Sequence, residues 1–488
     1  MAYRYGNRDQ QELFPQAIEE YVTEDDPVRA YDTFVEALDF NNLGIVLDEN
    51  KVGNPEYNPK TMLKLLIYGP SYGIRSSRKL ERAIYHNLSF IWLMGGLKPD
   101  HKTISMFRKD NRHVLKNVLK QCAQMCIKLD LITGNSLFVD GSKIRANASI
   151  KNTWTKEKCQ EYLKKIDRHI EAVLDECETI DSQEQNQPSL VKLNKEIKDK
   201  QALKTKVQAI LKELKQDDKK SVNTIDKECT RINSVQGSHA GYNVQTVVDE
   251  KHGLIVNADV VSENNDVNQF ANQIEQANKT LGKKCDTACA DSGYANTEQL
   301  KQIDQQDIKV IVPSQRQASK KEPEEFDKER FNYNSAKDCY ICPQGHMLIY
   351  EGSDGKTKRY KITKSSICRQ CNHFGKCTKS LHGRQINRLV DEETRLRLEA
   401  QYLQPESQVI YKLRKQKVEL PFGHIKRNLG VKEFLLRGVN GVKAEMSVLA
   451  VCFNITRMAN ILGVETLIAK LKGNIVYEMP APTEAIAI

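Results

Sequence analysis

Apolar residues at helical spacing dominate the first quarter of the chain. Met62, Leu63 and Leu66 share one helical face, and Gly69-Pro70 ends that helix. Two more amphipathic stretches follow, each bounded by a turn. We therefore predict an all-α domain of short helices over residues 1–130.

The pattern changes to that of strands at residue 136. The segment SLFVDGSKIRANAS opens with an apolar run, and GYNVQTVVDEKHGLIVNADVV alternates on both sides of a turn, which is typical of a β-hairpin. A helix, a short strand that ends at Asp291, another helix and the strand IKVIVP come next. This is the order of an RNase H-like core, a mixed sheet flanked by helices in an α/β fold. We predict its first part over residues 131–314.

A long insert interrupts these strands. Residues 151–226 place Leu, Ile and Val at helical spacing within dense mixed charge, which predicts a helical hairpin. We expect this hairpin to serve structure or assembly. Trp154, near its start, could stack on a displaced base, although packing is the more common role.

The last third of the chain divides into three segments. Residues 315–390 combine a polar linker with a small cysteine-bearing insert. Residues 391–470 return to helical spacing, and we expect them to complete the core. Residues 471–488 have the composition of a loose tail.

The cysteine-bearing insert has the spacing of a zinc ribbon. Its two CxxC pairs flank a predicted hairpin, and thiolates at this spacing suit tetrahedral Zn²⁺. His346 or Cys377 could replace one ligand, and reduced cysteines without metal are the alternative. The predicted structural zinc ligands are Cys339, Cys342, Cys368 and Cys371.

Charge and composition narrow the class of protein. The 74 basic and 64 acidic residues give a net charge of +10, which fits an anionic partner without requiring one. No apolar run approaches the roughly 20 residues needed to cross a bilayer. The opening MAYRYGNRDQQELF lacks an apolar signal core. We expect a soluble, cytoplasmic, DNA-associated protein.

The most basic part of the chain is residues 408–430, QVIYKLRKQKVELPFGHIKRNLG. It carries one acid, Glu419, among closely spaced lysines and arginines. A lone acid on so basic a helix is well placed to hold a divalent metal beside a phosphate backbone. A solvated helix with an ordinary Lys415–Glu419 pair is the plainer interpretation. Pro421 must kink this helix or begin a new one.

Two further acids stand at the ends of predicted strands. Asp140 follows an apolar strand, where a carboxylate is costly unless it is paired or bound to metal. Asp140-Gly141-Ser142 could instead form a β-turn. Asp291 also ends a strand. The N-terminal helices add basic residues that suit either DNA binding or an ordinary charged surface, notably Arg75, Arg78 and Arg108.

These segments occur together in an order known from one enzyme family. They are YNPKTMLKLLIYGPSYGIRSSRKLE, PDHKTISMFR, FVDGSKIRANAS, GYNVQTVVD, ADSGYAN, the paired CxxC insert and YKLRKQKVELPFGHIKRNLG. By these segments the chain resembles the DDE transposases of bacterial insertion sequences, and the resemblance extends from about Tyr57 to Leu462. The single pieces are weak, whereas the ordered set is specific.

The resemblance implies a catalytic site and its partners. Asp140, Asp291 and Glu419 would bind two Mg²⁺ ions, with Mn²⁺ as a substitute, and no covalent protein–DNA intermediate is needed. The N-terminal helices would recognise the terminal inverted repeats of the element, and target DNA would be the second substrate. A homodimer holding two DNA ends is also expected from the family.

A related Tyr-Arg-Glu-Lys signature falls on Tyr411, Arg414, Glu419 and Lys426. Many relatives have three residues between the Arg and the Glu, whereas this chain has four, with Lys415 in the alternative position. Whether Arg414 or Lys415 contacts DNA is therefore open. We expect the other basic residues and Tyr411 to contact DNA, with Arg427 among them.

We expect an active transposase that cuts and joins DNA by a two-metal mechanism. A non-catalytic DNA-binding protein derived from a transposase is the alternative. A metal-dependent repair nuclease fits less well, because simple cutting needs neither the long insert nor the cysteines.

Overall fold

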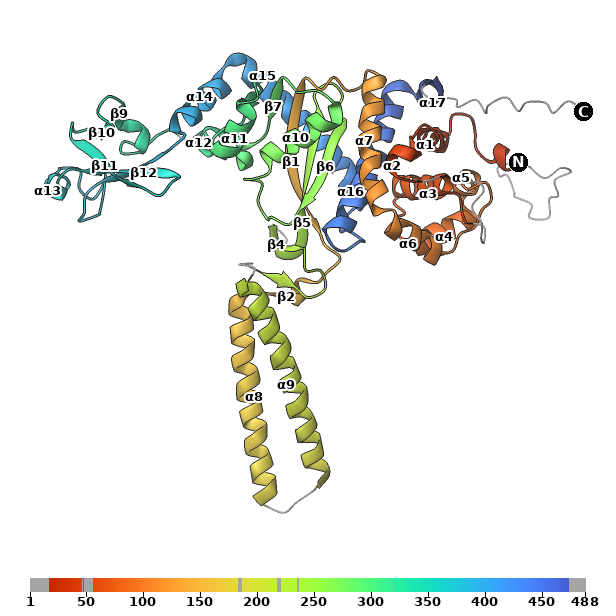
Figure 1. Cartoon of the computed structure of the whole chain (residues 1–488), viewed down its shortest axis with the longest axis horizontal. Helices are drawn as coiled ribbons and strands as arrows, with labels where there is room; N and C mark the ends of the chain where they lie inside the picture. The colour runs from red at the N-terminus through yellow and green to blue at the C-terminus, as the bar shows by residue number, and fades with distance from the viewer. Residues whose placement is uncertain are drawn as a thin grey trace, which may run out of the picture.

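The computed structural model describes residues 17–45, 47, 56–182, 187–216, 221–234, 237–320 and 322–473. A central sheet packs between helices, the N-terminal helices lie at one end, and a smaller sheet lies at the other (Figure 1). A helical hairpin projects away from this body. The mixed α/β architecture with a helical N-terminal region is as predicted. Most of the predicted tail, from residue 474 on, lies outside the described residues.

The central sheet positions the first strand-end aspartate. β5 pairs antiparallel with β1 from Leu137–Asp249 to Arg145–Gly241. β7 runs parallel to β1 but pairs with it only as far as Phe138–Cys289, so β1 loses this neighbour before Asp140. The order is β4-β5-β1-β7-β8, with β6 also paired to β5. The strands are β1 (Ser136–Arg145), β4 (Thr230–Ser234), β5 (Gly237–Asp249), β6 (Ile255–Val261), β7 (Thr287–Cys289) and β8 (Lys309–Ile311).

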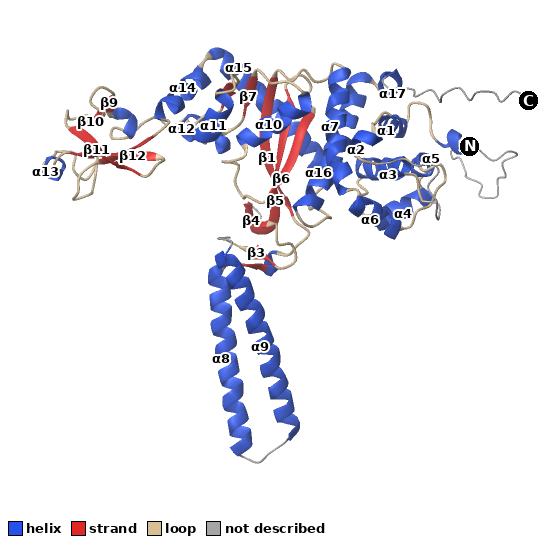
Figure 2. Cartoon of the chain, viewed as in Figure 1, coloured by secondary structure: helices blue, strands red, loops and turns tan. Residues whose placement is uncertain are grey.

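An apolar helix, α16 (Val439–Leu462), supports one side of this sheet (Figure 2). Its Asn454 acts like a neighbouring strand, because its side chain donates to the Ile255 carbonyl and accepts from the Ile255 N–H, both at 2.9 Å. The other helices beside the sheet are α7 (Arg112–Lys128), α10 (Phe270–Leu281) and α11 (Thr297–Asp304), and α17 (Val464–Gly473) follows α16 and packs against it. Within the described residues no single helix is long and apolar enough to cross a membrane, and only the bent pair α16–α17 passes by length and composition.

The N-terminal region consists of short helices, and a polar residue precedes each of α1 to α6. Asn58 accepts a hydrogen bond from the Lys60 N–H at 2.8 Å, and Pro59 opens α3. The elements are η1 (Ile18–Tyr21), α1 (Pro27–Glu36), α2 (Phe40–Leu43), α3 (Pro59–Ser71), α4 (Ser77–His86), α5 (Leu88–Leu93) and α6 (His101–Asp110). Cys122 and Cys126 of α7 are buried against Asn454 and Met458 of α16, which suits thiols that act as small apolar side chains.

The insert forms the predicted hairpin of α8 (Lys156–Ser182) and α9 (Gln187–Gln216). Its helices pack through a small apolar cluster that includes Ile166 and Val207. The stem is closed by η2 (Ile150–Asn152) and by β2 (Thr153–Trp154) paired with β3 (Val222–Asn223). Trp154 packs edge-on against Tyr162 with ring centroids 5.2 Å apart, as expected for a packing role.

The smaller sheet has the order β13-β12-β11-β10-β9 and its own apolar cluster. Its strands are β9 (Asn332–Asn334), β10 (Cys339–Ile341), β11 (Met347–Ser353), β12 (Thr357–Ile362) and β13 (Gln385–Leu389). Of the helices in this part of the chain, α13 (Ser365–Arg369) packs on β12 and η4 (Lys328–Arg330) precedes β9, whereas α12 (Gln315–Ser319) and α14 (Glu392–Leu403) lie against the central body.

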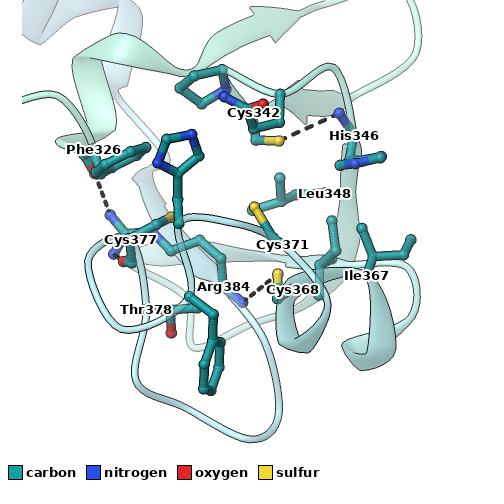
Figure 3. A pocket seen from close by; sticks show the side chains of 15 residues that line it. Phe326, Cys342, His346, Leu348, Ile367, Cys368, Cys371, Cys377, Thr378 and Arg384 are labelled. Carbon is teal, nitrogen blue, oxygen red and sulfur yellow. Dashed lines mark hydrogen bonds between the residues drawn. The ribbon is translucent and has the colours of Figure 1, made fainter.

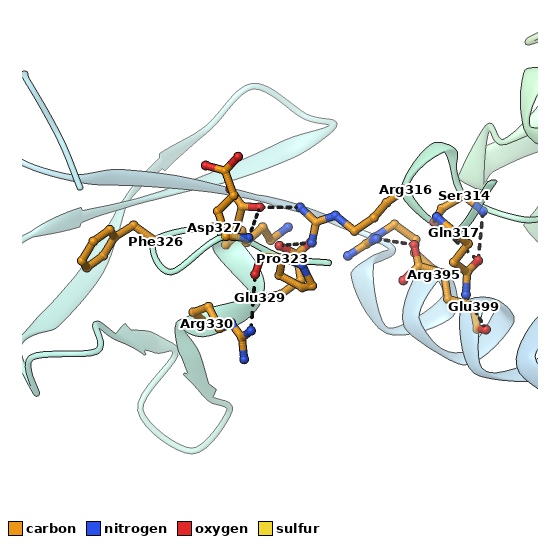
Figure 4. A network of polar contacts seen from close by, with 12 residues as sticks. Ser314, Arg316, Gln317, Pro323, Phe326, Asp327, Glu329, Arg330, Arg395 and Glu399 are labelled. Carbon is orange, nitrogen blue, oxygen red and sulfur yellow. Dashed lines mark hydrogen bonds and ion pairs between the residues drawn. The ribbon is translucent and has the colours of Figure 1, made fainter. Parts of the chain in front are cut away.

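The segment predicted to be a linker to this sheet is held by polar contacts (Figure 4). Arg316 forms ion pairs with Asp327 at 3.1 Å and with Glu329 at 2.5 Å. Gln317 donates to the Glu399 carbonyl of α14 at 2.9 Å. The described part of the expected linker is therefore held by ion pairs among its own charged residues and by a hydrogen bond to α14.

Candidate active site

The first aspartate of the site lies in the middle of β1. Leu137, Phe138 and Val139 are fully buried and anchor the strand, and Asp140 follows them with a side chain that is 20% exposed. Asp140 lies opposite Thr246 of β5. The prediction of a strand that carries a carboxylate therefore describes the local structure, and the strand continues through Gly141 and Ser142 rather than turning there.

The second aspartate follows the end of β7. Asp291 begins the short helix η3 (Ser292–Tyr294), and its Oδ1 accepts a hydrogen bond from the Gly293 N–H at 2.8 Å. Because β1 and β7 are parallel neighbours whose pairing stops at Phe138–Cys289, the two aspartates that follow this point lie in one region of the sheet.

A buried arginine joins these aspartates. Arg414 lies on α15 (Pro405–Gly423) with only 8% of its side chain exposed. One of its terminal nitrogens is 3.1 Å from Asp140 Oδ1 and 3.5 Å from Asp291 Oδ2. Its Nε is buried without a hydrogen-bond partner among the described residues. The site thus already holds one cation between two carboxylates.

Burial dominates the electrostatics of Asp140. Loss of solvent raises the pKa of Asp140 to about 6, the positive charge of Arg414 opposes this rise, and the charges of Asp291 and Asp266 add to it. Burial also raises the pKa of Tyr411, which is half-buried and packs against Tyr402 at 5.1 Å. The position of Asp140 therefore favours a nearby cation.

Glu419 does not join the two aspartates in the structure. Five residues beyond Arg414, it is turned by about 140° around α15 and is exposed. It lines a separate hollow with His424, Arg427 and Arg457. Within the described residues, which include all three predicted acids, no group of three or more His, Cys, Asp or Glu side chains is arranged to hold a metal ion. α15 continues past Pro421 and passes into the π-helical turn η5 (His424–Asn428).

The structure separates the predicted DNA-contacting residues into buried and exposed groups. Arg75 pairs with Glu445 of α16 at 2.8 Å and so ties the N-terminal helices to it, and Arg108 donates to the Arg75 carbonyl at 3.0 Å. Arg414 is likewise engaged by Asp140 and Asp291, so in this conformation all three side chains bind other parts of the protein, and their contact with DNA stays a prediction. The exposed residues are Arg78, Lys415, Lys426 and Arg427. Lys426 donates to Ser142, two residues after Asp140.

Four cysteines border one pocket of the smaller sheet (Figure 3). Cys342 accepts a hydrogen bond from the His346 N–H at 3.3 Å, and Cys368 accepts one from the Arg384 N–H at 3.4 Å. The other two are Cys371 and Cys377. Cys339 is 2% exposed within β10 and is not among the residues that line the pocket, so the predicted set of four is not the set gathered here.

A group of polar side chains beside β1 was not among the residues predicted from the sequence. Asn243 and Gln245 are fully buried on β5, and both donate to Asp266, at 2.8 and 2.7 Å. The detectable signal was the pair of amides within the otherwise apolar strand GYNVQTVVD, since buried amides need polar partners. Asp266, in the turn before α10, had no such signal.

Two family models match the chain. The model described as Transposase domain (DUF772) matches residues 16–110, and the model described as Transposase DDE domain matches residues 341–459. The first covers the N-terminal helices, and the second runs from the smaller sheet through α15 into α16. Comparison with curated proteins and with solved structures gave no match. Asp140, Asp266 and Asp291 lie between the two matched regions.

Proposed function

We propose that this DDE transposase of the insertion-sequence type binds the terminal inverted repeats of its element and cuts and joins DNA strands with the aid of Mg²⁺. The observation that carries the proposal is the pair Asp140 and Asp291, which converge on one cationic group from neighbouring parallel strands. An RNase H-like core is supported by the strand order β6-β5-β1-β7-β8. In this row β6, β1, β7 and β8 run in the same direction, and β5 runs antiparallel to them.

The residues at the site fit a divalent cation by their chemistry. Carboxylate oxygens are the ligands that Mg²⁺ prefers, and Asp140 and Asp291 already share one positive charge. In this conformation Arg414 offsets the charges of Asp140 and Asp291, so metal binding requires its guanidinium to move or to share the carboxylates. Bound there, divalent ions would activate a water or a DNA 3′-hydroxyl and stabilise the leaving oxygen.

The chain itself would position the DNA. Lys415, Lys426 and Arg427 are exposed along α15 and η5, and Lys426 reaches β1 next to Asp140. These charges would bind backbone phosphates and hold a scissile phosphate over the aspartates. Of the two signature candidates, we propose Lys415 for the phosphate contact, because Arg414 is engaged by the acids. Arg78 would contribute from the N-terminal helices, and a homodimer would hold two ends.

We also propose a structural Zn²⁺ site formed by Cys342, Cys368, Cys371 and Cys377. All four line one pocket, and the backbone N–H groups that donate to Cys342 and Cys368 would stabilise thiolates. In the described conformation the four sulfurs are not arranged to hold a metal, so binding would draw them together. Cys339 would pack within the sheet instead.

The zinc proposal predicts different effects for two serine variants. The protein purified under reducing conditions should contain about one zinc per chain by elemental mass spectrometry. Cys377→Ser should weaken zinc retention against a chelator by at least about tenfold, whereas Cys339→Ser should retain it. If Cys339→Ser loses zinc and Cys377→Ser retains it, the proposed ligand set is wrong. The ligands are then the four cysteines of the two CxxC pairs.

The catalytic proposal is tested with the full chain on supercoiled plasmid that carries the element ends. With Mg²⁺ we expect nicked or linear DNA cut at those ends, and removal of the metal with EDTA should stop cleavage while protein still retards the DNA in a gel. Binding without any cleavage in Mg²⁺ or Mn²⁺ would favour the alternative, a DNA-binding protein derived from a transposase.

A further inference from the structure

The helix α9 of the hairpin has one side against α8 and one side facing outward. Val207 and Leu214 are buried in the apolar cluster that joins the two helices. Seven residues make nearly two turns of a helix, so Lys198, Thr205 and Lys212 share one side, opposite Val207. All three are exposed, and the hairpin projects away from the body (Figure 1). This side of α9 is therefore available to a partner.

Lysines dominate the outward side of α9. Four exposed lysines lie on it or along one edge of it, and we call them the lysine face: Lys195, Lys198, Lys206 and Lys212. None of the four forms an ion pair with a described residue, whereas Lys204, which is nearer α8, pairs with Asp167 at 2.6 Å. Ala202 and Ala209 lie between them, so a partner can come close to the helix. The lysine face thus presents unpaired positive charge over small side chains.

The acids near the lysine face do not neutralise it. Glu213, at its edge, already pairs with Lys227 at 3.0 Å. Asp199 is exposed but points about 100° away from Lys198 around the helix. Like charges that are close on a helix destabilise it, and an anion bound between them removes that repulsion. The lysine face therefore favours a partner with many negative charges.

The outward side of α8 differs from it in charge. The positions that face away from α9 carry four exposed acids and two exposed bases, namely Glu157, Glu161, Glu171, Asp175, Lys164 and Arg168. Mixed charge of this kind is ordinary for a helix in solvent. A hairpin that acted only as a spacer would have such charge on both helices, so the lysines of α9 need a further explanation.

The length of the lysine face suits a DNA duplex. Residues 195 to 212 rise about 26 Å along the helix, at about 1.5 Å per residue. A duplex lying along α9 would present roughly 15 phosphate charges over that length, at about one charge per 1.7 Å of its axis. Lysine contacts phosphates as a flexible point charge, and such contacts read no sequence. Charge complementarity therefore selects duplex DNA of any sequence as the occupant.

A polar hollow of about 740 Å³ lies at the base of the hairpin. Lys227, the partner of Glu213, lines it on the side of the hairpin. Asn265 lines it on the side of the body, and its carbonyl accepts a hydrogen bond from Asn243 of β5, the strand paired with β1. The hollow thus lies between the edge of the lysine face and the sheet that carries Asp140, so a duplex on this face would approach the sheet from that side.

Resting on the proposed function, we infer that the lysine face of α9 binds the phosphate backbone of duplex DNA without reading its sequence, and so holds DNA that extends beyond the strands being cut. This gives the hairpin a substrate-holding role in addition to the structural role expected from its sequence. The contact is electrostatic, so it weakens steeply with salt.

The inference is tested with a random-sequence duplex of about 60 base pairs and the full chain. Lys198→Gln/Lys212→Gln removes two charges from the lysine face and keeps side chains that favour a helix. This variant should bind the duplex about tenfold more weakly than wild type. The slope of log affinity against log salt should become shallower by about 2, since each phosphate contact contributes about 0.9. Fluorescence anisotropy over a series of salt concentrations measures both quantities.

Lys164→Gln/Arg168→Gln is the matched control, because it removes two exposed charges from the outward side of α8. It should change the affinity by no more than about twofold. Circular dichroism checks that both variants are folded like wild type. Wild-type affinity and salt slope in Lys198→Gln/Lys212→Gln, or an equal loss in the α8 control, would overturn the inference.

The duplex lacks element ends, so this result is independent of cleavage. If Lys198→Gln/Lys212→Gln loses affinity as expected while wild type cuts no element ends, the inference stands and the catalytic proposal fails. Sedimentation without DNA tests the other occupant, a second copy of this chain. A wild-type dimer that Lys198→Gln/Lys212→Gln dissociates would show that the lysine face binds protein and would contradict the inference.

Discussion

Replacing Asp140 with Asn should lower the rate of Mg²⁺-dependent DNA cleavage by about a thousandfold or more, which corresponds to about 4 kcal/mol of lost transition-state stabilisation. The amide keeps the size of the side chain but removes the charge that would hold the metal. DNA binding should stay within about twofold, since the exposed basic residues that bind phosphates are unchanged. Single-turnover cleavage at saturating protein measures the first quantity, and gel retardation measures the second.

Asp291→Asn should give a loss of similar size, and the double variant should be scarcely worse than either single one. When two residues act together in one step, removing either one already loses most of the rate enhancement, so removing the second adds little. Asp286→Asn, at the start of β7, is the control for a lost negative charge on the same strand. Cleavage at the normal rate by either Asp140→Asn or Asp291→Asn would show that this acid is wrongly assigned.

Replacing Glu445 with Ala should lower the free energy of unfolding by about 3–5 kcal/mol. Glu445 accepts hydrogen bonds from the backbone N–H groups of Leu435 and Leu436, both at 3.0 Å, and pairs with Arg75. Burial raises the pKa of Glu445 despite these partners, so the carboxylate is costly to bury. Removing the carboxylate costs more free energy than burying it, because Arg75 would lose its charge partner in a poorly solvated site. The two backbone N–H groups would also be left without an acceptor.

Urea-induced unfolding of the full chain measures this loss, with the slope compared to confirm that the same surface is exposed. Glu445→Gln keeps an acceptor without the charge and should cost less, about 1–3 kcal/mol. Glu465→Ala, at an exposed position in the first turn of α17, should stay within about 0.5 kcal/mol. An Ala variant at position 445 as stable as wild type would show that Arg75 and Glu445 do not tie the N-terminal helices to α16.

The cysteines and the basic residues show what the spacing of residues in the sequence can predict and what it cannot. The CxxC spacing indicated a group of cysteines with Cys377 as an alternative member, and Cys377 does line the pocket, whereas the alternation of β10 turns Cys339 away from it. The arginines of the N-terminal helices look like DNA contacts in the sequence. Arg75 instead pairs with Glu445 of α16, which lies 370 residues away in the chain, and Arg108 donates to the Arg75 carbonyl.

The sequence by itself determined the strands that carry Asp140 and Asp291, the helical hairpin and the basic helix around Arg414. Periodicity, turns and strand ends are local properties, so neighbouring residues suffice to encode them. Only the tertiary structure decided which side chains meet. The rotation of α15 places Arg414 against the aspartates and Glu419 away from them, and a turn on the other side of β1 brings in Asp266. Such contacts depend on how a helix packs on a sheet and on where a loop distant in sequence lies in the fold. No single segment of the sequence specifies either.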